Sequence, residues 1–245
     1  MLTLLGALRE EVEGLRKGIV QQKTCGLPSG RLYEGMLGGR HILLAQTGPG
    51  RERAEVAARF LLEHYPVDGM ISFGFAGALS PGLAVGDIVL YQKLFSVATG
   101  TVGITCYSDA ALLSQAVRVL SGEVNLIVGD SLTAERVVSG SREKKALGKM
   151  VGAVAVDMES YWVAKVAGSY QIPFLAVRAI SDDSEGRLPD FGQFFDARGE
   201  LSRKAAARYF LSHPRELAML PAICQDVRRA ERSLSRFLAA LVHEL

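Results

Sequence analysis

Two apolar runs of this chain end abruptly in acidic residues, and this pattern constrains the fold more than any other. Residues 155–160 read Ala-Val-Asp-Met-Glu-Ser, and residues 176–183 read Ala-Val-Arg-Ala-Ile-Ser-Asp-Asp. Buried parallel strands of α/β proteins have such sequences, with charge confined to their carboxyl ends. Ligands of open α/β folds bind at that edge of the sheet. The pattern therefore predicts an α/β fold with a polar site where two strands end.

The acidic residues at these strand ends have two interpretations. They can supply general acid–base groups to a small polar molecule. Alternatively, they cap the helices that follow, since Asp and Glu satisfy the free N–H groups at a helix N-terminus. One acidic strand end fits both interpretations equally. Two such ends, with a third acid near the N-terminus at Glu11, favour a site.

Predicted strands and helices alternate along the chain. We expect further strands at residues 2–8, 41–46, 67–73, 86–91 and 124–129, and a hairpin that joins residues 31–36 to 41–46. We expect helices at residues 10–17, 52–64, 108–120, 144–148 and 160–167. This alternation predicts a three-layer α/β fold, in which a central mixed, mostly parallel sheet is flanked by helices.

The composition shows no domain boundary before about residue 190. We therefore expect one domain over residues 1–245, with residues 196–245 as a helical C-terminal extension. The net charge is +2 with both signs interspersed, which argues against a general nucleic-acid binder. No apolar run reaches the length of about 18 residues that a spanning helix needs.

The cysteines and histidines give no pattern of a disulfide framework or a metal site. Cys25, Cys106 and Cys224 are far apart, and the four histidines are isolated from one another. Reduced thiols are typical of cytosolic proteins. We therefore expect a cytoplasmic protein that carries no metal and no cofactor.

Two glycine-rich segments follow predicted strands, Gly48-Pro49-Gly50 and Gly74-Phe75-Ala76-Gly77. Glycine allows the backbone to approach a ligand closely or to adopt positive φ. Neither segment matches the dinucleotide-binding fingerprint, so a nicotinamide-dependent oxidoreductase has weak support. The segments are interpreted either as tight turns or as backbone that lines a sugar or anion pocket.

Residues 221–241 are predicted to form an amphipathic helix. Arginines populate one side of it, and an apolar stripe runs along the other, formed by Ile223, Val227, Ala230, Leu234, Phe237, Leu238 and Leu241. Such a helix can lie on an anionic membrane surface. It can equally pack on the core or on a partner subunit, and both interpretations stay open.

Several segments in chain order carry a resemblance to the nucleoside phosphorylase/nucleosidase family, and within it to the methylthioadenosine/S-adenosylhomocysteine nucleosidases. They are residues 6–12, 74–79, 83–89, 155–159 and 173–182. The resemblance implies cleavage of the N-glycosidic bond of a purine nucleoside, release of adenine and a homo-oligomer. A narrower resemblance is to the branch found with hopanoid biosynthesis, which implies a lipid-linked substrate such as adenosylhopane.

The resemblance also implies roles for single residues. Asp182 is the acid that protonates the leaving base, Glu11 activates water, and Arg178 holds and orients the acidic groups. Residues expected to contact the substrate are Glu159 and Met158 at the ribose, Phe75, Ala76 and Gly77 in the glycine segment, and Val137 and Val138 behind the purine. Alternatives stay open: Glu10 for Glu11, Asp183 for Asp182, a structural ion pair for Arg178 and ordinary core for Met158. Asp157 is expected either to support the residues that contact the substrate or to be structural.

Water and phosphate are both possible nucleophiles in this family. Its phosphorylases carry a Gly-Asp-Pro-x-Arg element near the N-terminus, where this chain has residues 6–11 and a carboxylate at Glu11. Phe75 replaces a hydroxyl residue of relatives, although Arg51 and Arg53 can still reach an anion. We therefore expect a hydrolase, with a phosphorylase or a non-catalytic nucleoside-binding module as alternatives. A short segment at residues 95–108 predicts an open 5′ side that admits a bulky substituent.

Overall fold

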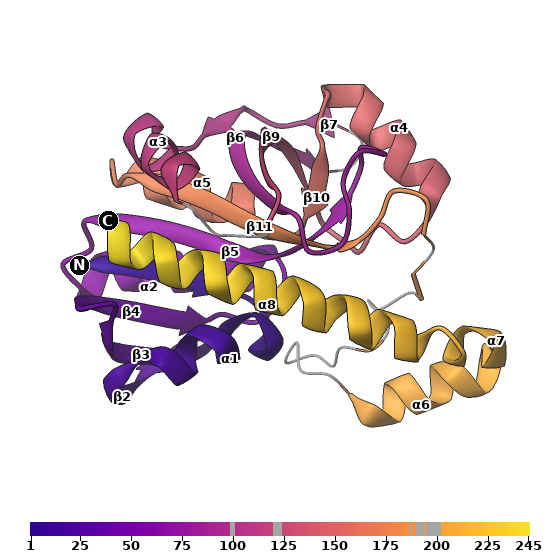
Figure 1. The fold of residues 1–245 in the computed structure, drawn as a ribbon, viewed down its shortest axis with the longest axis horizontal. Helices are drawn as coiled ribbons and strands as arrows, with labels where there is room; N and C mark the ends of the chain where they lie inside the picture. The colour runs from indigo at the N-terminus through magenta and orange to yellow at the C-terminus, as the bar shows by residue number, and fades with distance from the viewer. Residues whose placement is uncertain (99–100, 120–123, 187, 190–193, 195–201) are drawn as a thin grey trace.

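One mixed sheet organises the part of the chain that the structure describes (Figure 1). The structure is a computed structural model that describes residues 1–98, 101–119, 124–186, 188–189, 194 and 202–245. The strands are β1 Leu2–Gly6, β2 Val20–Leu27, β3 Gly30–Leu37, β4 Arg40–Gln46, β5 Gly69–Ala78, β6 Ile88–Ala98, β7 Thr101–Val102, β8 Cys106–Tyr107, β9 Leu126–Ala134, β10 Ala155–Asp157 and β11 Phe174–Asp182.

Strand order in the sheet is β10-β9-β6-β11-β5-β1-β4-β3-β2. The central strands β4, β1, β5 and β11 pair in parallel, whereas β6 pairs antiparallel with β11. At one end β10 pairs with both β9 and β5, so the sheet curls back on itself. The predicted mixed sheet flanked by helices is confirmed.

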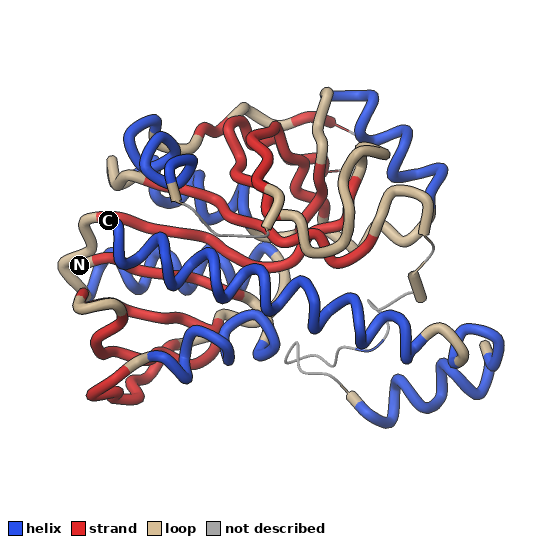
Figure 2. Tube along the Cα trace, in the orientation of Figure 1, coloured by secondary structure: helices blue, strands red, loops and turns tan. Residues whose placement is uncertain are grey.

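Helices cover both faces of the sheet (Figure 2). They are α1 Arg9–Gly18, α2 Arg51–His64, α3 Ala110–Arg118, α4 Ser141–Val151, α5 Ser160–Ser169, α6 Arg203–Ser212, α7 Pro214–Leu217 and α8 Leu220–Glu244. Successive residues of a strand face opposite sides, so Leu5 packs with α2 and α5, while Leu4 packs with α1, α3 and α8. Central strands are apolar on both faces for this reason.

Three of the described strands were not predicted from the sequence: the edge strand β2 and the two-residue strands β7 and β8. The longest of them, β2, has a physical explanation. Most of its residues are exposed, and it lies at the outer end of the sheet beside β3. An exposed edge strand needs no apolar alternation, so its polar sequence gave no signal. The strand expected at residues 124–129 is the beginning of β9, which continues to Ala134. The short helix expected at residues 144–148 is the longer α4.

The apolar stripe of α8 packs mostly against the body of the protein. Ala230, Leu234, Phe237, Leu238 and Leu241 are fully buried in the cluster that α8 shares with α1 and β11. The first turns of α8 and the short helices α6 and α7 project beyond the sheet (Figure 1). Within the described residues, no helix is long and apolar enough to cross a bilayer. The domain limits stay a prediction.

Replacing Phe237 with Ala should destabilise the protein by about 3–5 kcal/mol, because a buried aromatic side chain is lost and a cavity remains. The free energy of unfolding from urea denaturation measures the change. Arg236→Ala, at an exposed neighbouring position on the same helix, is the control and should change stability little. A small effect of Phe237→Ala would mean that α8 is a loosely attached arm.

Candidate active site

Glu11 is buried where β1 ends and α1 begins. Its Oε2 accepts hydrogen bonds from the backbone N–H groups of Ala7 and Leu8, and its Oε1 accepts one from Phe75, each at 2.8 Å. The first turn of α1 thus turns the carboxylate back toward the glycine segment of β5. Burial raises the pKa of Glu11, although the backbone hydrogen bonds and the charge of Arg178 oppose the rise.

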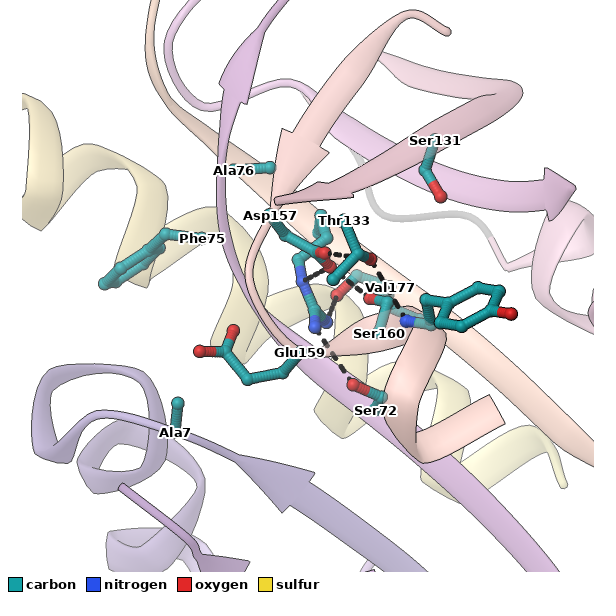
Figure 3. Close-up of polar contacts among 12 residues, drawn as sticks. Ala7, Ser72, Phe75, Ala76, Ser131, Thr133, Asp157, Glu159, Ser160 and Val177 are labelled. Atoms are coloured by element: carbon teal, nitrogen blue, oxygen red, sulfur yellow. Dashed lines mark hydrogen bonds and ion pairs between the residues drawn. The ribbon is translucent and has the colours of Figure 1, made fainter. Parts of the chain in front are cut away.

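Arg178 and Asp157 form a buried ion pair beside Glu11. The Arg178 Nε lies 2.9 Å from Asp157 Oδ2, and both side chains are almost completely buried. Arg178 Nη2 also donates to Ser72 Oγ at 2.9 Å, while Asp157 accepts hydrogen bonds from the hydroxyls of Thr133 and Ser160 (Figure 3). Arg178 is therefore held by Ser72 of β5, by Asp157 of β10 and by the backbone carbonyl of Val177 in its own strand. Burial lowers its pKa, but the surrounding acids outweigh this effect, so the net shift is upward.

Glu159 follows β10 directly and faces the same region. Its Oε1 accepts a hydrogen bond of 2.8 Å from the backbone N–H of Gly50, in the first glycine-rich segment. Gly50 has a φ of 93°, a conformation that favours glycine. In the view of Figure 3 the Glu159 side chain points toward the side on which Ala7 and Phe75 are drawn. Burial raises its pKa to about 8, and the charges of Asp157 and Glu11 add to the rise.

Asp182 ends β11 beside Gly77 of β5. Its Oδ1 accepts a hydrogen bond from the Ser181 hydroxyl at 2.9 Å. Its Oδ2 lies 2.5 Å from the Nζ of Lys144 on α4, and the Lys144 side chain is completely buried. Asp182 thus occupies a mostly enclosed position with a cation at one oxygen.

Strand β5 holds these groups in a row. Ser72 binds Arg178, and the carboxylates of Glu11 and Asp182 lie where a Cβ would stand on Gly74 and on Gly77, respectively. Gly74 and Gly77 are three residues apart, which is about 10 Å along a strand. The structure therefore brings Glu11, Glu159 and Arg178 together and places Asp182 at the other end of the same glycine segment. Phe75 and Ala76 lie between the two ends, and Gly77 forms the end at Asp182.

Burial distinguishes the neighbouring acids that the sequence left open. Glu10 is exposed, whereas Glu11 is 5% exposed. Asp183 is exposed too, and its Oδ1 accepts hydrogen bonds from the backbone of its own turn, at Glu185 and Gly186. The geometry favours Glu11 and Asp182 as the groups that face the site.

The other residues predicted to contact the substrate are Val137, Val138 and Met158. Val138 is buried in a small apolar cluster with Leu79, Leu132 and Val156, so its side chain belongs to the core. Val137 and Met158 are partly exposed. Their roles at the purine and the ribose stay predictions. Among the described residues, no group of three or more potential ligands is arranged to hold a metal ion.

Sequence reasoning missed the partners that hold the charged groups. Ser72, Thr133, Ser160 and Lys144 all contact Arg178, Asp157 or Asp182. The three hydroxyl residues stand in apolar strands or at a helix start, where such residues are common. Lys144 stands beside Lys145 in a charged helix, and nothing in the local sequence distinguishes the buried lysine from the exposed one.

Comparison with known proteins relates this arrangement to one family. A model of the family described as the phosphorylase superfamily matches residues 2–212. The 5′-methylthioadenosine/S-adenosylhomocysteine nucleosidase of Staphylococcus epidermidis is 29% identical over 215 residues, which cover 80% of this chain and 92% of the relative.

Solved structures show the same fold. The 5′-methylthioadenosine/S-adenosylhomocysteine nucleosidase of Neisseria meningitidis, in complex with methylthio-immucillin-A, superposes with a TM-score of 0.79 at 24% identity, over 100% of this chain and 99% of the other. A futalosine hydrolase of Helicobacter pylori superposes with a TM-score of 0.76 at 19% identity, over 100% and 97% of the two chains.

Replacing Gly74 with Ala should lower kcat/KM at least roughly 100-fold, because the displaced Glu11 would lose its position. An added Cβ would lie 2.5 Å from Glu11 Oε1, closer than any real contact. Steady-state kinetics on a cleavable nucleoside measure the loss. The control is Gly82→Ala, since a Cβ at Gly82 meets nothing within 4 Å. Wild-type kinetics in Gly74→Ala would refute the importance of this carboxylate.

Replacing Glu159 with Gln should stabilise the protein at alkaline pH. The folded protein holds the Glu159 proton up to about pH 8, whereas the unfolded chain loses it near pH 4.5. Ionisation therefore opposes folding, and wild-type stability falls across that interval. The Tm of Glu159→Gln should exceed the wild-type Tm by a few degrees at pH 8.5, and the difference should shrink toward pH 5.

Differential scanning calorimetry over this pH range tests the expectation. Glu52→Gln, at an exposed position on α2, should show no pH-dependent difference from wild type. A Glu159→Gln protein that is less stable than wild type at pH 8.5 would contradict the raised pKa.

Proposed function

The chain belongs to the phosphorylase superfamily, and from this premise we propose that it is a purine nucleosidase. It hydrolyses the N-glycosidic bond of an adenine nucleoside and releases free adenine. The observation that carries the proposal is the buried Glu11 carboxylate, which accepts three backbone hydrogen bonds at the ends of β1 and β5. The nucleosidases among its relatives support the same activity.

Hydrolysis of this bond requires three separate tasks. The sugar passes through a transition state with oxocarbenium character, the base must leave with a proton, and water must attack the anomeric carbon. Each task suits a group already described. Glu159 accepts hydrogen bonds from the ribose hydroxyls, Asp182 serves the leaving base, and Glu11 takes the proton of the attacking water.

The placement of Glu11 suits its task as a base. A carboxylate has about four lone-pair positions, and the backbone occupies three of those of Glu11. The remaining position on Oε1 can accept a proton from a water molecule. The raised pKa of the buried carboxyl makes it a stronger base than an exposed glutamate.

Charge at the site favours water over phosphate as the nucleophile. Arg178 is paired with Asp157, and Arg51 pairs with Glu55 and lies over the Trp162 ring at 4.1 Å. The guanidinium of Arg53 donates to the backbone carbonyl of Ser29 at 3.5 Å. These arginines thus have partners within the protein, while Glu11 presents negative charge where phosphate would bind.

We further propose that the nucleoside carries a large 5′ substituent, with adenosylhopane as the substrate that the hopanoid-branch resemblance suggests. The short segment at residues 95–108 supports this part of the proposal. A membrane contact by α8 would depend on its exposed arginines and on α6 and α7, because the apolar stripe is mostly buried. The cytoplasmic location and the homo-oligomer also remain proposals.

Purified protein should release free adenine from adenosine, methylthioadenosine or adenosylhopane without phosphate. Chromatography detects adenine, and the sugar product should be the free sugar rather than its 1-phosphate. Glu11→Gln should lower the rate at least about 100-fold, because the general base is lost. Glu10→Gln, the exposed neighbour, is the matched control and should keep the wild-type rate.

The alternatives predict other outcomes in the same assay. A strict requirement for phosphate, with a sugar 1-phosphate as product, would identify a phosphorylase. Binding of a nucleoside without any release of adenine would identify a non-catalytic binding module. Either result would refute the nucleosidase.

A further inference from the structure

Lys144 is a completely buried lysine whose ammonium group is bound at the carboxylate of Asp182. Its Nζ lies 2.5 Å from Asp182 Oδ2 and donates to the backbone carbonyl of Asp183, also at 2.5 Å. The next residue on α4, Lys145, has 46% of its side chain exposed and pairs with Glu185 at the surface. The two lysines are adjacent in sequence, but only one points into the protein.

Burial of Lys144 has a cost that the fold alone does not explain. An ammonium group removed from water loses several kcal/mol of solvation unless ionic and hydrogen-bonding partners replace it. A leucine or methionine would fill the same space without this cost. The partners that Lys144 receives are Asp182 and the backbone of the next residue, so its charge is directed at the proposed acid.

The ion pair changes how Asp182 can act. The Lys144 ammonium donates its hydrogen bond to Asp182 Oδ2, so this oxygen accepts a proton and does not present one of its own to the base. The leaving adenine requires a proton. The Lys144 ammonium holds a proton 2.5 Å from Asp182 Oδ2, and it is the cation that the structure places at this carboxylate.

We propose that Lys144 and Asp182 act as one proton-donating pair, in which Lys144 positions Asp182 and supplies the proton that Asp182 passes to the base. This inference rests on the proposed nucleosidase activity. Lys144 is a positioning residue, because it reaches the substrate only through Asp182.

Every proton and electron pair is accounted for when Lys144 and Asp182 act on an adenine nucleoside. The bond between C1′ and N9 breaks, and its electron pair moves to the base. A proton passes from Lys144 Nζ to Asp182 Oδ2, and the Asp182 carboxyl gives a proton to N7. Water adds to C1′ and transfers a proton to Glu11. The protein then holds a neutral Lys144 amine, an Asp182 carboxylate and a protonated Glu11, and exchange with solvent returns the proton from Glu11 to Lys144.

The test compares two leaving groups in Lys144→Met. Adenine needs protonation to leave, whereas nitrophenolate does not. Cleavage of 4-nitrophenyl riboside therefore depends on sugar binding and water attack but not on proton donation to the leaving group. Adenine release should fall at least about 100-fold in Lys144→Met, within the range expected of general acid catalysis. Release of nitrophenol should stay within about threefold of wild type. The control Lys145→Met, on the same turn of α4, should leave both rates unchanged.

A second variant separates the proton supply from simple placement of the carboxylate. Lys144→Gln can still donate a hydrogen bond to Asp182 but carries no transferable proton. Adenine release should remain low in this variant. Wild-type adenine release in either Lys144 variant, or an equal loss of both activities in folded protein, would overturn the proposal.

Asp182→Asn distinguishes this inference from the proposed function. A selective loss of adenine release in Asp182→Asn, without such a loss in the Lys144 variants, would refute the proton-donating pair. The proposed nucleosidase activity would still stand. Unchanged adenine release in Asp182→Asn would remove Asp182 from the reaction and the pair with it.

Discussion

The ion pair between Arg178 and Asp157 is the interaction on which the site depends. Two charges are buried there at 2.9 Å; Arg178 donates a further hydrogen bond to the Ser72 hydroxyl, and Asp157 accepts one from the Thr133 hydroxyl. A buried ion pair adds little stability by itself, and its loss leaves an uncompensated charge. The pair matters because of its position: the charge of the guanidinium lowers the pKa values of Glu11 and Glu159 and so opposes part of the rise that burial causes.

The same cluster illustrates a conflict between stability and activity. Burial raises the pKa values of Glu11 and Glu159, so the carboxylates needed for binding and catalysis are disfavoured in the folded state. Backbone N–H groups from two glycine-rich segments and from the start of α1 partly offset this cost. Gly74 and Gly77 are required because a Cβ at either position would meet the carboxylate of Glu11 or of Asp182, whereas Gly50 is favoured by its φ of 93°.

The sequence predicted the fold class and the main acids because both depend on local pattern. Apolar runs that end in charge mark the carboxyl ends of buried strands, and this pattern led directly to Glu159 and Asp182. The edge strand β2 and the buried state of Lys144 depend on tertiary contacts instead: β2 is polar because one side of it meets solvent, and Lys144 differs from Lys145 only in the direction it faces. Val138 was expected behind the purine, yet it packs with Leu132 and Val156, since an apolar side chain after a strand can face either the ligand or the core.

At one end of the strand order, β10 pairs with two strands, β9 and β5. At the other end, β2 pairs only with β3 among the described residues, so one side of β2 is an unpaired edge. Such an edge presents unpaired backbone groups that could recruit a strand from another molecule and begin aggregation. Here the edge is irregular: the pairing of β2 with β3 shifts register between Val20 and Lys23, Gln21 has a φ of 53°, and Lys23 adds an exposed charge. The polar sequence and irregular geometry of β2 therefore disfavour pairing of this edge with a strand of another molecule. The same polarity is the reason that the strand could not be predicted.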